Sequence, residues 1–155
     1  MVEQKEKLLV ALAGQQNSGK STLFNKLTGL QQHIANYPGV TVDKKSGFYS
    51  YNGQRVEVVD LPGTYALTSF SPEERVSRDF LLGEKPDVII NVVDAANLER
   101  SLFLTFQLME LNRPMLLVLN MMDVAQQLGL QIHLDQLQKH LGIPVIATIG
   151  SKAQG

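Results

Sequence analysis

A phosphate-binding loop is predicted near the N-terminus, where the sequence matches the pattern G-x-x-x-x-G-K-[ST]. The matching residues, together with the one that follows them, are Gly14, Gln15, Gln16, Asn17, Ser18, Gly19, Lys20, Ser21 and Thr22. In such a loop, backbone N–H groups at a helix N-terminus surround phosphate oxygens. We expect Lys20 to reach the β- and γ-phosphates and the Ser21 hydroxyl to coordinate Mg²⁺. The alternative is a turn that binds nothing, but a strand before it and a helix after it favour nucleotide binding.

A second motif, Asp60-Leu61-Pro62-Gly63, directly follows an apolar strand. An aspartate at the carboxyl end of a strand in an open α/β sheet points into the crevice where ligands bind. We expect Asp60 to hold Mg²⁺, directly or through water, and the Gly63 N–H to sense the γ-phosphate. The pattern D-x-x-G is also common in ordinary turns, and its position about 40 residues after the phosphate loop favours the functional interpretation.

The motif Asn120-Met121-Met122-Asp123 follows another apolar strand and predicts the choice of base. A carboxylate at Asp123 can accept hydrogen bonds from N1–H and the exocyclic amine of guanine, whereas adenine would leave that charge unpaired. Asn120 can read the other edge of the base and brace the phosphate loop. The alternative is that Asp123 only caps a helix, since aspartate is a good N-cap. In that case the chain would be a P-loop kinase or ATPase.

The elements that must position these residues alternate between strands and helices, which predicts an α/β fold with a mostly parallel sheet. Helices are expected on both faces of six strands, and the Asn52-Gly53 turn makes one strand antiparallel. The strands are expected at residues 8–13, 46–51, 55–60, 88–94, 115–120 and 145–148, and the helices at 21–28, 72–82, 98–110 and 134–140. Ser71 is the expected N-cap of the second helix, and Gly83 and Gly142 the expected ends of two helices. Residues 29–45 show no periodicity and are expected to be functional or disordered.

Composition limits the classes of protein that this chain can belong to. Its 155 residues predict one domain, and a net charge of −1 with 44% hydrophobic residues argues against disorder and against dedicated nucleic-acid binding. The absence of cysteine excludes disulfides and thiolate metal sites. No apolar stretch approaches the roughly 20 residues of a membrane-spanning helix. We therefore expect a soluble cytoplasmic domain.

Together, the three motifs resemble those of the translation-factor-related GTPases, which include Ras-like proteins. The resemblance implies a Ras-like fold, binding of GTP or GDP, and hydrolysis of GTP. It also implies two switch segments, at residues 31–44 and 63–74, that order around the γ-phosphate, with Thr41 of the first closing over Mg²⁺. The loop after the last strand would contact guanine through Ile149, Gly150 and Ser151.

Two departures from the Ras-like pattern bear on the rate and the affinity. Thr64 replaces the glutamine that orients the attacking water, and residues 27–43 contain no arginine or lysine, so another cation must neutralise the transition state. In GTPases with asparagine at the position of Asn17, the resemblance implies that its side chain binds K⁺, which would stimulate a slow intrinsic rate. The alternative is an asparagine that tolerates unusual backbone angles. Met121 replaces a lysine that covers the base, which predicts modest affinity.

Longer stretches resemble the G domain of the bacterial ferrous iron transport protein B (FeoB) family. The residues that carry this resemblance are Gly19-Lys20-Ser21-Thr22-Leu23-Phe24-Asn25, Tyr37-Pro38-Gly39-Val40-Thr41-Val42, Asp60-Leu61-Pro62-Gly63-Thr64-Tyr65, Ser71-Pro72-Glu73-Glu74, Asp94-Ala95-Ala96-Asn97-Leu98-Glu99-Arg100 and Asn120-Met121-Met122-Asp123. The family implies a helical spacer, a fused membrane domain that moves Fe²⁺, possible oligomers through that domain, and a place on the cytoplasmic face of the bacterial inner membrane. Residues 1–155 would then be a fragment that lacks the last Ras-like helix, with a mobile loop at residues 149–155.

Other functions are compatible with the same phosphate loop. A binding module in which hydrolysis is negligible is supported by the missing glutamine. A soluble ribosome- or tRNA-associated GTPase is disfavoured because the chain has no basic patch and no RNA-binding segment, so no nucleic-acid partner is expected.

Overall fold

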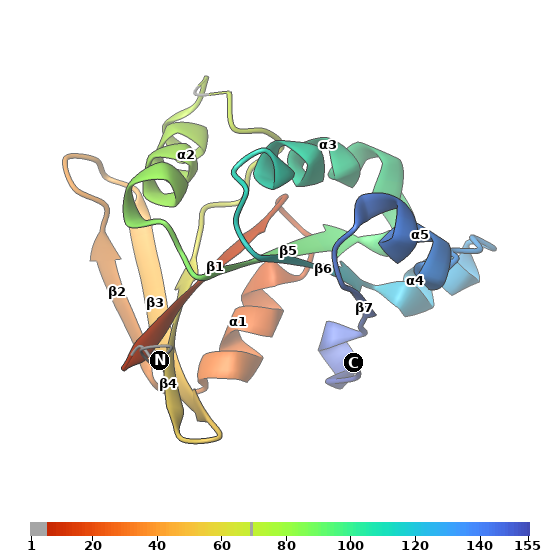
Figure 1. Ribbon diagram of the computed structural model, residues 1–155, viewed down its shortest axis with the longest axis horizontal. Coiled ribbons are helices and arrows are strands. Elements are labelled where there is room, and N and C mark those ends of the chain that lie inside the picture. Colours follow the sequence, from red (N-terminus) through yellow and green to blue (C-terminus); the bar gives the residue numbers. More distant parts are fainter. Residues whose placement is uncertain (1–5, 69) are drawn as a thin grey trace, which may run out of the picture.

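A computed structural model describes residues 6–68 and 70–155, so the second switch segment expected at residues 63–74 is described except at Ser69. The chain forms one seven-stranded sheet in the order β2-β3-β4-β1-β5-β6-β7 (Figure 1). The strands are β1 (Lys7–Gly14), β2 (Gln32–Asn36), β3 (Asp43–Tyr51), β4 (Gln54–Asp60), β5 (Val88–Asp94), β6 (Met115–Asn120) and β7 (Val145–Ala147). Among the described strands, only β3 runs antiparallel to its neighbours, as the Asn52-Gly53 turn predicts.

The helices cover both faces of the sheet, as expected from the sequence (Figure 1). They are α1 (Lys20–Thr28), α2 (Pro72–Glu84), α3 (Leu98–Met109), α4 (Met122–Gln127) and α5 (Leu134–Leu141), with 3₁₀ turns η1 (Ala95–Asn97) and η2 (Gly150–Lys152). Phe24 of α1 packs on one face, against Val10, Leu12, Val56 and Val58. Helices α2 and α3 pack on the other face, where Phe80 and Leu104 join a cluster with Ala11 and Val59. Burial on both faces explains the continuous apolar strands β1, β5 and β6.

Strand β2 is the main departure from the predicted fold, because it makes the sheet seven-stranded instead of six-stranded. It lies within residues 29–45, where the sequence shows no periodicity, and all five of its residues are exposed. Backbone pairing with β3 holds it at the edge of the sheet. A strand that buries neither face has no need for apolar alternation, so its sequence carries no strand signal.

Smaller differences concern the ends of helices. Helix α2 continues through Gly83, and the left-handed residue at its end is Lys85, so the expected end at Gly83 was wrong. Gly142 ends α5 with a φ of 70°, as expected. Helix α4 has only six residues and was missed. The loop expected to be mobile at residues 149–155 contains η2, and backbone hydrogen bonds join Ile149 to Gln154.

Candidate nucleotide site

The phosphate loop joins β1 to α1 through residues that accept positive φ angles. Gly19 has a φ of 85° and Asn17 a φ of 63°, which glycine and asparagine tolerate best. Gly14 must lack a side chain, because a Cβ there would lie 2.4 Å from the carbonyl oxygen of Val92. Gly19 precedes the first residue of α1 and offers no side-chain cap, so the N–H groups of the first turn remain directed at the loop. This geometry fits a phosphate group.

The phosphate loop lines one of two neighbouring pockets that share Lys20, Ser21 and Gly63. The first has a volume of about 390 Å³ and is lined by Gln15, Gln16, Asn17, Gly19, Lys20, Ser21, Thr22 and Gly63. The second, of about 380 Å³, is lined by residues that include Ser21, Thr41 and Asp60. The structure therefore brings to one pocket the three residues that the sequence suggests for Mg²⁺.

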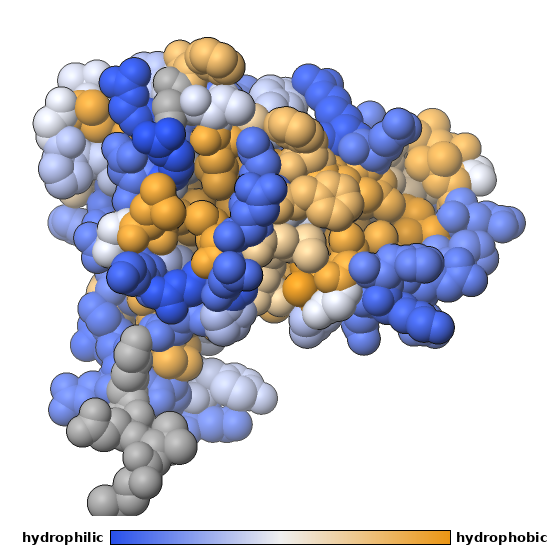
Figure 2. Space-filling view, turned by 45° about the horizontal axis from the view of Figure 1, so that its top comes forward, coloured by the Kyte–Doolittle hydropathy of each residue, from blue (hydrophilic) through white to orange (hydrophobic). Residues whose placement is uncertain are grey.

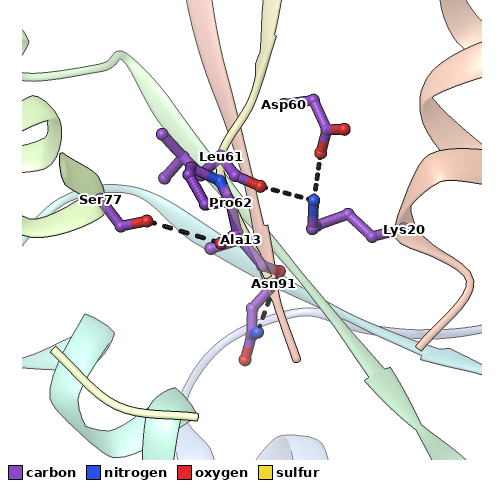
Figure 3. Close-up of polar contacts among 7 residues, drawn as sticks. All are labelled: Ala13, Lys20, Asp60, Leu61, Pro62, Ser77 and Asn91. Atoms are coloured by element: carbon purple, nitrogen blue, oxygen red, sulfur yellow. Dashed lines mark hydrogen bonds and ion pairs between the residues drawn. The ribbon is translucent and has the colours of Figure 1, made fainter. Parts of the chain in front are cut away.

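Lys20, which lines both pockets, forms an ion pair with Asp60 of the second pocket, and both side chains are buried (Figure 3). Lys20 Nζ also donates a hydrogen bond of 2.5 Å to the carbonyl oxygen of Leu61. A buried charge is stable only when it is paired, so each of these two groups keeps the other in place. A triphosphate with Mg²⁺ could replace both partners without leaving either charge unpaired.

Two polar residues that the sequence analysis missed position the backbone of this site (Figure 3). Asn91, fully buried in β5, donates from Nδ2 to the carbonyl oxygen of Ala13 at 3.2 Å, and its Oδ1 accepts from the Thr105 hydroxyl at 2.6 Å. Ser77 of α2 lies 3.5 Å from the carbonyl oxygen of Pro62. An asparagine inside the apolar run of β5 was the available signal, because a buried polar side chain needs partners.

Thr41 lies in an exposed turn that Tyr37 anchors. The backbone N–H of Tyr37 donates to the carbonyl oxygen of Val42 at 3.0 Å, and the Tyr37 ring packs edge-on against Phe80 at 6.2 Å. The Tyr37 hydroxyl is buried and has no hydrogen-bond partner within the described residues. Burial, and then the negative charge of Asp60, raise the pKa of Tyr37 well above its ordinary value. The Tyr37 hydroxyl therefore keeps its proton, and the ring holds the turn in place by packing.

Asn120 joins the predicted base site to the phosphate loop. Its Nδ2 donates to the carbonyl oxygen of Ser18 at 3.0 Å, and its Oδ1 accepts from the Gly150 N–H at 2.8 Å and the Thr148 hydroxyl at 3.0 Å. Three segments that are distant in sequence thus meet at one buried side chain. Ile149 and Ser151 flank Gly150 in the loop expected to contact guanine. This arrangement is the bracing role suggested for Asn120.

Asp123 lies beside this junction and is not the N-cap of α4. That position belongs to Met121, whose φ is 60°, and no side chain caps the helix. Asp123 Oδ2 instead lies 3.9 Å from Lys152 Nζ, and the carboxylate is partly exposed. The Met121 methyl group lies near Gly19, at 3.7 Å from where a Cβ would be. The structure thus removes the capping explanation for Asp123 and leaves its carboxylate accessible to a ligand.

The residues that the structure describes contain no group of three or more His, Cys, Asp or Glu side chains that could hold a metal ion. Over the same ranges, no helix has the length and apolar character needed to cross a membrane.

Comparison with known proteins identifies the family. The model of the N-terminal part of ferrous iron transport protein B matches residues 8–155. The chain belongs to the FeoB family. It is 46% identical over 154 residues to the Fe(2+) transporter FeoB of Escherichia coli strain K12, a match that covers 97% of this chain and 20% of that protein. The chain thus spans about a fifth of the length of the curated FeoB relatives it matches.

Solved FeoB structures confirm the Ras-like α/β fold. The G domain of the T. maritima FeoB iron transporter has 43% identity and a TM-score of 0.89, over 96% of this chain and 91% of that one. A mutant of S. thermophilus NFeoB bound to GDP has 50% identity and a TM-score of 0.88, over 94% and 57%. The cytosolic domain of L. pneumophila FeoB has 42% identity and a TM-score of 0.91, over 95% and 64%. The resemblance to FeoB G domains is therefore confirmed.

Proposed function

We propose that residues 1–155 are the GTP-binding and GTP-hydrolysing domain of a longer FeoB protein, and that they regulate Fe²⁺ uptake by a fused membrane domain. The observation that carries this proposal is the meeting of the phosphate loop, Asp60 and Thr41 around one pair of pockets, with Asn120 joining the phosphate loop to the loop at residues 148–150. Similarity to FeoB structures bound to GDP supports guanine as the base.

Each predicted site residue has a role in this proposal. Backbone N–H groups of residues 14–22 cradle the phosphates, and Lys20 moves from Asp60 to the β- and γ-phosphates. Ser21, Thr41 and Asp60 would hold Mg²⁺, which supplies charge neutralisation at the phosphate oxygens. The Gly63 N–H orients the γ-phosphate. At the base, Asp123 accepts from guanine, Asn120 and the backbone of residues 149–151 bind its other edge, and the Met121 side chain covers its plane.

The cation that assists hydrolysis is proposed to be K⁺ held by Asn17. The Asn17 side chain is exposed and lines the phosphate pocket, so its oxygen is available to a cation there. Thr64 is buried where the catalytic glutamine would follow Gly63, and a threonine cannot reach an attacking water in the same way. Both points favour a slow rate that depends on a monovalent cation.

The rest of the longer protein supplies the proposed partners. Because curated FeoB relatives are about five times longer than this chain, we propose that a helical spacer and a membrane domain for Fe²⁺ accompany it. The G domain would then lie at the cytoplasmic face of the inner membrane, where nucleotide is available.

Competition binding tests the choice of nucleotide. We expect GTP and GDP to displace a fluorescent guanine nucleotide at least ~100-fold more effectively than ATP, because adenine leaves the Asp123 carboxylate without donors. Asp123→Ala should remove most of this preference. The matched control is Asp135→Ala, at an exposed aspartate in the first turn of α5. Equal displacement by ATP and GTP in the unmodified chain would contradict the proposal.

A nucleotide-binding switch that does not hydrolyse GTP is the second candidate, and the threonine at position 64 favours it. Single-turnover phosphate release in KCl separates the two functions. A rate at the level of the uncatalysed reaction would support the switch alone.

A further inference from the structure

Helix α3 contacts the segment that follows Gly63 at two points. The Arg100 guanidinium carbon lies 4.5 Å from the centre of the Tyr65 ring. Seven residues further along α3, Gln107 Oε1 accepts a 2.8 Å hydrogen bond from the backbone N–H of Leu67. Residues seven apart lie on the same face of a helix, so one face of α3 follows this part of the second switch segment.

Arg100 is also tied to the phosphate loop. The buried Gln15 side chain donates from Nε2 to the carbonyl oxygen of Arg100 at 3.0 Å. In turn, the backbone N–H of Thr64 donates to the carbonyl oxygen of Gly14 at 3.0 Å. The loop, the switch segment and the start of α3 are therefore linked pairwise, and Arg100 takes part in two of the three links.

Gly63 lies next to these links and has little room to move toward the loop. A Cβ at position 63 would lie 2.8 Å from Gln16 Cγ and 3.1 Å from the Gln16 backbone nitrogen. Its position relative to a phosphate therefore depends on what holds the residues that follow it. Thr64 is fixed by its backbone, and Tyr65 by the guanidinium of Arg100.

We propose that Arg100 is a positioning residue for GTP hydrolysis, which acts by holding Tyr65 and thereby placing Gly63 against the γ-phosphate. The inference rests on the proposed function and adds a residue to it. A guanidinium over an aromatic face is attracted by the ring's negative potential, and its planar shape suits stacking. Because Arg100 acts through Tyr65, it contributes geometry to the reaction rather than charge.

The contact between Arg100 and Tyr65 lies where it could respond to a bound nucleotide. Arg100 and Tyr65 line a hollow of about 1110 Å³, and Gln15 lines both that hollow and the phosphate pocket. Figure 2 shows apolar side chains gathered on the face that carries α2 and α3. The pair is thus supported on one side by the loop and open to solvent on the other.

A double-mutant cycle tests the inference on the 155-residue chain. We expect Arg100→Gln and Tyr65→Leu each to lower kcat for GTP by roughly 3- to 10-fold, with GDP affinity changed less than about 2-fold. The double variant should lose no more than the larger single effect, because both changes remove one contact. Tyr65→Phe keeps the ring and should retain most of the rate. The control is Arg78→Gln, at a half-exposed arginine of α2 that lies 3.8 Å from its neighbour Asp79.

Amide hydrogen exchange gives a readout that is independent of turnover. A non-hydrolysable GTP analogue with Mg²⁺ should protect residues 63–68 in the unmodified chain and in Arg78→Gln, and protect them clearly less in Arg100→Gln. Normal turnover and normal protection in Arg100→Gln, or additive effects of the two substitutions, would overturn the inference while the proposed function stands. Failure of the unmodified chain to hydrolyse GTP would instead contradict the proposed function.

Discussion

At the scale of single residues, charged side chains of the proposed site are paired with other protein side chains, and a bound nucleotide would have to replace these pairs. Lys20 and Asp60 neutralise each other, and Asp123 lies near Lys152. Phosphate, Mg²⁺ and guanine would each replace a contact that already exists. Nucleotide binding is then an exchange of partners, and its free energy is smaller than the new contacts alone would suggest.

Asn17 allows its backbone and side-chain roles to be separated. We expect GTP hydrolysis to be at least several-fold faster in KCl than in NaCl, and Asn17→Ala to abolish the difference, because the side-chain oxygen is lost. Alanine is also strained at a φ of 63°. Asn17→Gly removes that strain together with the side chain, so it should lose the K⁺ effect as well. K⁺ stimulation that persists in the glycine variant would show that Asn17 is needed only for its backbone angles.

Tyr37 makes a prediction about stability and pH. Its hydroxyl is buried without a partner among the described residues, so Tyr37→Phe should leave the free energy of unfolding at pH 7 unchanged or raise it by about 1 kcal/mol. Burial raises the pKa of Tyr37 in the folded chain, so the hydroxyl loses its proton less readily there than in the unfolded chain. The contribution of Tyr37 to the free energy of unfolding is therefore constant below the ordinary pKa of 10.0 and falls as the pH rises above that value. Urea unfolding at pH 7 and pH 11 should show the variant's advantage growing with pH. A destabilised variant at pH 7 would mean that the hydroxyl has a partner.

At the scale of elements, α2 begins with a cap that also organises the switch segment before it. Ser71 Oγ accepts from the Glu74 N–H at 3.1 Å, and Glu74 Oε2 accepts from the Thr68 hydroxyl at 2.6 Å and from the Phe70 N–H at 3.2 Å. The Ser-x-x-Glu spacing is that of a capping box, but the glutamate reaches further back than the cap residue.

Loss of this cap should be measurable. We expect Ser71→Ala to lower the free energy of unfolding by about 1 kcal/mol, because one N–H of the first turn loses its acceptor. Thermal unfolding should then shift by roughly 2 to 4 °C. Ser50→Ala, at an exposed serine of β3, serves as the control and should change the midpoint much less. An equal change in both variants would exclude a capping role for Ser71.

The same elements show what could be predicted from sequence. Buried strands such as β5 carry apolar runs, and the Ser71 cap carries a residue pattern, so both were predicted correctly. Strand β2 was missed because backbone pairing alone holds it, and Lys85 was missed as a helix end because its left-handed angle has no signature in the residue type. The phosphate loop, Thr41, Asp60 and Gly63 share two neighbouring pockets, as their motifs suggest. Asn91 and Arg100 gain their positions only from tertiary contacts.

At the scale of the whole molecule, the proposed nucleotide site joins segments that are far apart in the sequence. Asn120 links the phosphate loop, the end of β6 and the loop after β7, while Lys20 links α1 to β4. Ligands that bind between such parts stabilise the fold as a whole, since binding requires all of them to be in place.

Thermal unfolding should therefore report guanine binding. At about 100 times its dissociation constant, GDP with Mg²⁺ should add about 2.7 kcal/mol to the free energy of unfolding, or roughly 5 to 10 °C in the midpoint. ATP at the same concentration should produce no comparable shift. Scanning calorimetry on the 155-residue chain measures both, and an equal shift with ATP would contradict recognition of guanine.

The β3–β4 hairpin has a consequence for how this domain can be handled in experiments. The turn that carries Thr41 enters β3 at Asp43, and the segment with Gly63 leaves β4 at Asp60, so both depart from one end of the hairpin. The Asn52-Gly53 turn is exposed at the opposite end, with nothing within 4 Å of where a Gly53 Cβ would lie. A dye, an affinity peptide or a surface anchor attached at this turn would lie at the end of the hairpin opposite the segments with Thr41 and Gly63. It would therefore leave the proposed nucleotide site unobstructed during binding and hydrolysis measurements.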